Sequence, residues 1–235
     1  MCGRSCSSHA QQSGPAREHG SVLAGIERRA LVWMAVRLPS WVSSDFLTIV
    51  GGVAMLGTGL AFASAQTMRW TLALVPLLLA VNWFGDSLDG TVARVRQRQR
   101  PRYGFYVDHV VDIVNAVLLF AGMALSGLIS GWIAASLLVA YLLLCAESFL
   151  AAQTVGVFRL SFSGFGPTEL RILLSVGALV AMVKPVVSPL GLGPHLFFDV
   201  GGLIGAIGMF GAFSMSAMRN TRVLYRAEPL PPERS

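Results

Sequence analysis

Residues 86–112 read DSLDGTVARVRQRQRPRYGFYVDHVVD and carry four aspartates, at positions 86, 89, 108 and 112. The aspartates lie at the edges of two apolar segments that are each long enough to cross a membrane. Because a carboxylate is costly in hydrocarbon, acidic residues in this position mark a functional site by default. We therefore interpret the segment as a metal-binding site.

The spacing of these residues places them on helix faces. Within a helix over residues 70–93, Asn82, Asp86 and Asp89 share one face because they are four and three residues apart. The next segment repeats this spacing at Asp108, Asp112 and Asn115. Two facing helices would then aim four carboxylates at one point.

Four converging carboxylates favour a hard cation. An all-oxygen environment suits divalent cations such as Mg²⁺, and without a cation the four groups could not all stay ionised. The segment has no second histidine and no paired cysteines, which argues against zinc. The alternative is that the aspartates only pair with the neighbouring arginines.

The same residues resemble the signature of the class I CDP-alcohol phosphotransferases, the CDP-alcohol phosphatidyltransferase family of integral membrane enzymes that make phospholipid head groups. The signature reads Asp-x2-Asp-Gly-x2-Ala-Arg, a spacer, and then Gly-x3-Asp-x3-Asp. Its eight positions are all present, as Asp86, Asp89, Gly90, Ala93, Arg94, Gly104, Asp108 and Asp112. The spacer between Arg94 and Gly104 is one residue longer than is common.

The resemblance implies a role for each signature residue. The four metal ligands would be Asp86, Asp89, Asp108 and Asp112, which together hold two Mg²⁺ or Mn²⁺ ions. Asp112 would also be the catalytic base, and the CDP moiety would bind at Gly90, Ala93, Arg94 and Gly104. An alcohol hydroxyl would attack the phosphorus of a CDP-linked substrate and CMP would leave.

The substrates are less well defined by the sequence. We expect CDP-diacylglycerol as the phosphatidyl donor and a polar alcohol as the acceptor, with Arg171 binding an anionic acceptor. The segment 166–171 also resembles a threonine-glutamate segment of the aminoalcohol phosphotransferases, so the alternative is transfer from a CDP-choline- or CDP-ethanolamine-like donor to a lipid alcohol. Glu147 and Arg171 either line the polar cavity or are ordinary interfacial residues.

Two other classes of protein use acidic residues in membranes. A membrane prenyltransferase also binds Mg²⁺ and pyrophosphate, but it needs more spans and a different spacing of acids. A Mg²⁺ transporter or a non-catalytic Mg²⁺-binding protein has no need for the glycines and the Ala-Arg pair of the signature.

The composition predicts an all-α integral membrane protein. Of the 235 residues, 54% are hydrophobic and only 13% are charged, which is typical of a polytopic membrane protein. Apolar runs of about 20 residues predict six transmembrane helices, a number that the resemblance also implies. These spans are 45–65, 70–93, 106–128, 131–155, 168–189 and 197–218.

The remaining segments give the domain organisation. We expect a disordered tail over 1–20, an interfacial amphipathic helix over 21–41, the phosphotransferase domain over 42–222 and a cytoplasmic tail over 223–235. The helix over 21–41 mixes apolar residues with arginines and would lie at the headgroups until Pro39 ends it. The alternative is a solvated helix packed on the protein.

Arginines predict the orientation, since basic residues favour the cytoplasmic side. Most lie where a cytoplasmic N-terminus would place them inside, and only Arg69 and Lys184 would lie outside. Both termini and the active site are therefore expected on the cytoplasmic side of the inner cell membrane. The arginines of the loop 95–103 are attributed to anionic lipid, and no nucleic-acid partner is expected.

The last span spaces small residues as Gly201-xxx-Gly205, with Gly208 and Gly211 beyond. Such a face allows close helix approach, either within the bundle or between subunits. Of the two, we expect this face to pack within the bundle. We also expect the protein to form a homodimer.

Overall fold

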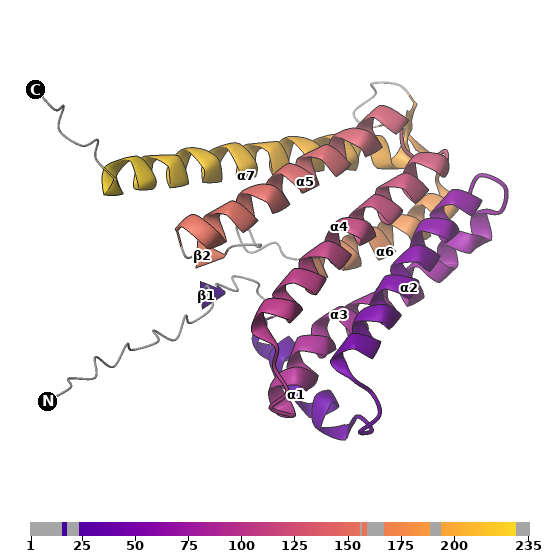
Figure 1. Ribbon diagram of the computed structural model, residues 1–235. Coiled ribbons are helices and arrows are strands. Elements are labelled where there is room, and N and C mark those ends of the chain that lie inside the picture. Colours follow the sequence, from indigo (N-terminus) through magenta and orange to yellow (C-terminus); the bar gives the residue numbers. More distant parts are fainter. Residues whose placement is uncertain (1–15, 18–23, 156, 159–166, 189–193, 229–235) are drawn as a thin grey trace, which may run out of the picture.

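The computed structural model describes residues 16–17, 24–155, 157–158, 167–188 and 194–228, and these are mostly helical (Figure 1). The helices are α1 (Ala24–Arg37), α2 (Ser44–Ser64), the 3₁₀ helix η1 (Arg69–Leu74), α3 (Val75–Val95), α4 (Pro101–Leu125), α5 (Gly131–Thr154), α6 (Pro167–Val183) and α7 (Phe197–Ala227). The structure also has two short strand pairs. Strand β1 (Ala16–Arg17) runs parallel to β2 (Val157–Phe158), and β3 (Val186–Val187) runs antiparallel to β4 (His195–Leu196). This architecture agrees with the predicted all-α class.

Within the described residues, five helical stretches are long and apolar enough to cross a membrane, which makes this a multi-pass membrane protein. These stretches are Ser44–Ser64, Arg69–Val95, Pro101–Leu125, Gly131–Thr154 and Phe197–Ala227. The predicted span 168–189 corresponds to α6, which has 17 residues. At 1.5 Å per residue α6 covers about 26 Å, less than the ~30 Å of a typical hydrocarbon core. Six spans therefore stay a prediction.

Prolines account for two helix boundaries that differ from the prediction. The span expected at 70–93 begins as a 3₁₀ helix and becomes α-helical at Val75, with Pro76 in the first turn of α3. The span expected from 106 begins at Pro101, because proline fits the first helical turn, where its missing N–H is not needed. As a result, Gly104 lies inside α4, where its N–H donates to the Arg100 carbonyl at 2.8 Å.

Helix α7 is longer than predicted and continues to Ala227. Residues 219–227 contain no glycine or proline, so nothing in this segment stops the helix. The boundary predicted between 222 and 223 therefore lies within a helix. Residues 229–235, and the predicted tail over 1–20 apart from Ala16–Arg17, lie outside the described part of the chain.

Helix α1 falls within the predicted interfacial segment and ends before Pro39. It buries Leu31 and Ala35 in a cluster with Leu88 and Val92 of α3. The other side of α1 leaves Trp33 exposed. The helix therefore packs on the protein with one face, and its position at a membrane surface stays a prediction.

Helices α2, α3 and α4 approach one another at glycines. A Cβ atom on Gly59 of α2 would lie 2.5 Å from the Leu118 carbonyl oxygen of α4, and one on Gly85 of α3 would lie 2.5 Å from the Leu47 carbonyl oxygen of α2. Only glycine allows backbones to pack so closely. The Gly85 contact brings the middle of α3 against the first turns of α2.

Helices α5 and α7 lie side by side (Figure 1). A Cβ atom on Gly202 would lie 2.8 Å from the Ile133 side chain, whereas one on Gly201, Gly208 or Gly211 would have no neighbour within 4 Å. Gly202, rather than most of the predicted small-residue face, therefore makes the close contact within the bundle. The structure describes one chain, and the homodimer stays a prediction.

Candidate active site

Three of the predicted site aspartates line one small cavity between α2, α3 and α4. Its lining residues are Thr48, Gly51 and Gly52 of α2, Asn82, Asp86 and Asp89 of α3, and Asp108, Val111 and Asn115 of α4. The cavity volume is about 10 Å³, which is about the room that one water molecule needs. Apart from Val111 and the two glycines, every lining side chain carries an oxygen atom.

The fourth aspartate, Asp112, lies beside this cavity. It is not among the lining residues, but its carboxylate is within electrostatic range of Asp86, Asp89 and Asp108. The structure therefore brings the four aspartates into one neighbourhood, as their spacing on two helices predicts. Their role as metal ligands stays a prediction.

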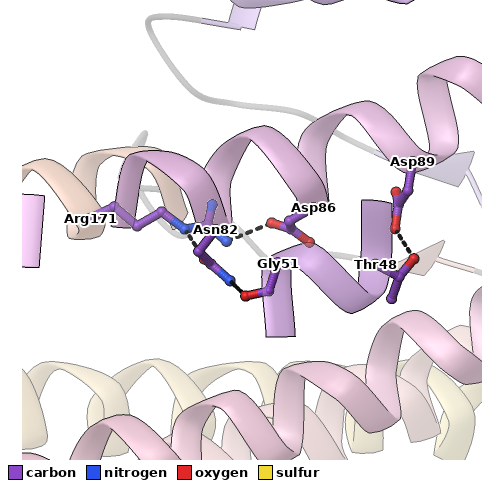
Figure 2. Close-up of polar contacts among 6 residues, drawn as sticks. All are labelled: Thr48, Gly51, Asn82, Asp86, Asp89 and Arg171. Carbon is purple, nitrogen blue, oxygen red and sulfur yellow. Dashed lines mark hydrogen bonds and ion pairs between the residues drawn. The ribbon is translucent and has the colours of Figure 1, made fainter. Parts of the chain in front are cut away.

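Arg171 reaches the site from α6 and binds two residues of α3, as Figure 2 shows. Its Nη2 atom donates to Asp86 Oδ2 at 2.5 Å and its Nε atom donates to Asn82 Oδ1 at 3.0 Å. The Asn82 Nδ2 atom in turn donates to the Gly51 carbonyl of α2 at 2.9 Å. This chain of hydrogen bonds joins three helices and holds the Asp86 carboxylate on the side of Arg171.

The first turns of α2 hold Asp89. Thr48 Oγ1 donates to Asp89 Oδ2 at 2.7 Å (Figure 2), and the Gly90 N–H donates to the other carboxylate oxygen. Ser44 Oγ also donates to the Asp89 carbonyl at 2.9 Å. Both oxygens of this carboxylate therefore have a protein partner.

Sequence reasoning did not identify Thr48 and Ser44 as site residues. The available signal was their spacing, because residues four apart lie on one helix face, and Gly51 continues that face. Helix α2 begins at Ser44 because the Ser43 hydroxyl accepts a hydrogen bond from the Phe46 N–H at 3.1 Å, which is an ordinary N-cap. The cap therefore fixes the positions of the Ser44 and Thr48 hydroxyls relative to α3.

The glycines of the signature lie outside the cavity wall, and Gly104 faces open space. A Cβ atom on Gly104 would meet nothing within 4 Å, and one on Gly90 would meet only the Arg94 guanidinium at 3.5 Å. Arg94 is exposed, and its Nη2 atom donates to Thr91 Oγ1 at 2.9 Å. Ala93 is half-buried next to it in sequence.

Glu147 does not line the cavity. It is buried on α5, where its Oε1 atom accepts hydrogen bonds from Ser216 Oγ at 2.9 Å and Asn220 Nδ2 at 2.7 Å, both on α7. The sequence left open whether Glu147 lines a polar cavity or is an ordinary interfacial residue, and the structure instead shows it buried and hydrogen-bonded to α7. The residue joins the C-terminal parts of α5 and α7.

The cavity residues fit a hard divalent cation by their chemistry. The donors are carboxylate, carboxamide and hydroxyl oxygens, which are the ligands that Mg²⁺ prefers. One buried acceptor, Asn115 Oδ1, has no hydrogen-bond partner within the described residues. Among those same residues, no group of three or more His, Cys, Asp or Glu side chains is gathered closely enough to form a metal site.

Comparison with known proteins gives one family. The family model described as CDP-alcohol phosphatidyltransferase matches residues 41–213, a range that includes the cavity, the signature and α6. No curated protein sequence matches the chain.

Proposed function

The chain belongs to the CDP-alcohol phosphatidyltransferase family, the transferases that move a phosphatidyl group from a CDP-alcohol to an acceptor, and on that premise we propose that its donor is CDP-diacylglycerol and its acceptor a polar alcohol. The observation that carries the transfer reaction is the cavity between α2, α3 and α4, which three signature aspartates line. The family is in general dependent on divalent metal ions. The fourth signature aspartate lies beside them.

In the proposed reaction the acceptor hydroxyl oxygen attacks the phosphorus that carries the diacylglycerol. A new P–O bond forms, the bond from this phosphorus to the oxygen of CMP breaks, and CMP leaves with the electron pair. The hydroxyl proton passes to a carboxylate, for which we propose Asp112. Asp112 lies beside the cavity and within electrostatic range of the other three aspartates, which supports this assignment.

Asp86, Asp89, Asp108 and Asp112 would hold the metal, which we propose to be two Mg²⁺ or Mn²⁺ ions. When bound, the ions would supply positive charge that neutralises the pyrophosphate and stabilises the leaving group. The chain prepares this site through hydrogen bonds: Thr48 orients Asp89, and Arg171 orients Asp86.

The open space at Gly104 supports a CDP-binding role for the signature residues. A nucleotide can lie against helix backbone only where no side chain intervenes, and Gly104 leaves such a surface. The exposed guanidinium of Arg94 is placed to donate to a phosphate, for which its planar fork is suited. Ala93 keeps the neighbouring position small.

Arg171 remains our candidate for the acceptor. Its Nε and Nη2 atoms donate hydrogen bonds to Asn82 and Asp86. Because a guanidinium has five N–H donors, its other N–H groups can donate to an anionic acceptor. Arg171 would then link the acceptor to Asp86 directly. An inositol phosphate or a glycerol phosphate has the required charge.

For location we propose the inner cell membrane, with both termini and the site on the cytoplasmic side, and a homodimer. The arginines of the short connection between α3 and α4 support this orientation, since basic loops stay inside. The exposed Gln97 lies in this connection. A cysteine at this position should react only with reagents that reach the cytoplasm, and labelling from outside intact cells would refute the orientation.

The acceptor and the donor are tested together by CMP release. Purified protein with Mg²⁺ receives either CDP-diacylglycerol with a panel of polar alcohols and their phosphates, or a CDP-aminoalcohol with diacylglycerol. We expect CMP only in the first arm. CMP only in the second arm would refute the proposed donor in favour of aminoalcohol transfer, which the segment Pro167–Thr168–Glu169 also supports by its resemblance to those enzymes.

A further inference from the structure

The side chain of Asn115 has an unused acceptor in the wall of the cavity. Asn115 lies on α4, three residues after Asp112, and lines the cavity together with Asp86, Asp89 and Asp108. The residue is only 8% exposed, and its Oδ1 atom accepts no hydrogen bond from any described residue. A buried acceptor without a partner is costly and calls for an explanation.

The other asparagine of the cavity provides a contrast. Asn82 is fully buried, its Nδ2 atom donates to the Gly51 carbonyl, and its Oδ1 atom accepts from Arg171. Protein partners therefore explain Asn82 as a residue that joins helices. No such partner explains the oxygen of Asn115.

The surroundings indicate what this oxygen meets. The cavity has about the volume of one water molecule, so the partner is small. Three carboxylates in the same wall exclude an anion and favour a positive charge. Carboxamide oxygens are among the ligands that hard divalent cations accept beside carboxylates.

We propose that Asn115 contributes its side-chain oxygen to the ligand set of one of the divalent cations that the aspartates would hold. This inference rests on the metal site of the proposed function and adds to it a neutral ligand outside the signature. A neutral oxygen completes the coordination of a cation without adding a further negative charge to four neighbouring carboxylates.

The test measures Mn²⁺ binding without any substrate. Purified protein in detergent is titrated with Mn²⁺, and electron paramagnetic resonance reports the free ion. Asn115→Leu keeps the size of the side chain but removes the oxygen, and we expect its Kd for Mn²⁺ to rise about tenfold or more, as for loss of residues that support a metal site. Asn115→Asp keeps an oxygen at the position and should bind Mn²⁺ at least as tightly as the wild type.

Asn220→Leu is the matched control, because it makes the same change in an asparagine of α7 that is bonded to Glu147. Its Kd for Mn²⁺ should equal that of the wild type. Asn115→Ala replaces Asn115→Leu if the leucine variant does not elute as a folded protein, and the same rise in Kd is expected of it.

An unchanged Kd in Asn115→Leu would overturn the inference, and so would equal weakening in Asn115→Asp, since shape rather than the oxygen would then matter. Asp89→Asn separates this inference from the proposed function. If Asp89→Asn loses Mn²⁺ while Asn115→Leu retains it, the metal site stands and only the role of Asn115 is refuted. If the wild type binds no Mn²⁺, both fail.

Discussion

Replacing Thr48 by valine tests whether α2 positions the site carboxylate of Asp89. Valine has the shape of threonine without the hydroxyl, so the change removes the 2.7 Å hydrogen bond to Asp89 Oδ2 and keeps the packing. The hydroxyl also lies 3.2 Å from the Ser44 carbonyl, but the shorter contact to a charged acceptor is the stronger one. Asp89 would then keep only the Gly90 N–H on its carboxylate.

The expected effect follows from the strength of that bond. A hydrogen bond to a charged group contributes roughly 1.5–3 kcal/mol, and 1.36 kcal/mol corresponds to about a tenfold change. Because Asp89 is half-buried rather than buried, we expect an effect at the lower end of this range. Either kcat/KM for the CDP substrate should fall about tenfold, or the Mg²⁺ concentration for half-maximal activity should rise about tenfold.

The assay is CMP release from the purified protein as a function of Mg²⁺. Thr48→Ser keeps the hydroxyl and should retain the wild-type Mg²⁺ dependence. Thr58→Val is the control on the same helix, because the buried Thr58 hydroxyl donates to the Ala54 carbonyl of its own helix at 2.9 Å. Unchanged Mg²⁺ dependence and kcat/KM in Thr48→Val would refute the positioning role, and an equal loss in Thr48→Ser would assign it to packing.

Three further changes test other parts of the structure. Gly59→Ala places a methyl group 2.5 Å from a backbone carbonyl of α4 and should destabilise the fold by about 1–3 kcal/mol, measured by thermal unfolding. Gly208→Ala, whose methyl group meets nothing within 4 Å, is the control and should not destabilise it. Equal Tm values for the two variants would contradict the close approach. Asp199→Ala removes hydrogen bonds from the Ser130 N–H and hydroxyl and should lower stability by about 2 kcal/mol, and an unchanged Tm would show that this link is unimportant. Arg171→Gln should raise KM for an anionic acceptor about tenfold or more and raise KM for the CDP substrate less, through the loss of the hydrogen bond to Asp86, so that equal rises would remove the acceptor role.

The sequence predicted the parts of the site that have a strong periodic signal. The spacing within each pair, Asp86 with Asp89 and Asp108 with Asp112, places both aspartates of the pair on one helix face. A short connection then brings the two helices together. The same signal placed Asn82 and Asn115 on these faces but did not distinguish their roles. That distinction depends on Arg171, which is far away in sequence and takes the acceptor of only one of them.

Other features depended on contacts that periodicity does not encode. Most hydroxyls in helices bond their own backbone, as Thr58 does, so nothing in the sequence marked Thr48 as a partner of Asp89. Gly202 makes the glycine contact at which α5 and α7 approach each other closely, whereas the sequence pointed to the neighbouring Gly201 and its face. Helix α4 begins before the predicted boundary because Pro101 fits its first turn, which apolar runs do not reveal.

The most direct test of the central claim is Mg²⁺-dependent CMP release from CDP-diacylglycerol by the wild type beside Asp89→Asn and Asp108→Asn. Both substitutions keep the size of the side chain and remove one charge from a group in the cavity wall. We predict that the wild type releases CMP only with a divalent cation, and that both variants lose this activity while keeping the helical circular dichroism and elution volume of the wild type. CMP release at wild-type rates by either variant at ordinary Mg²⁺ would contradict the assignment of these aspartates to the active site.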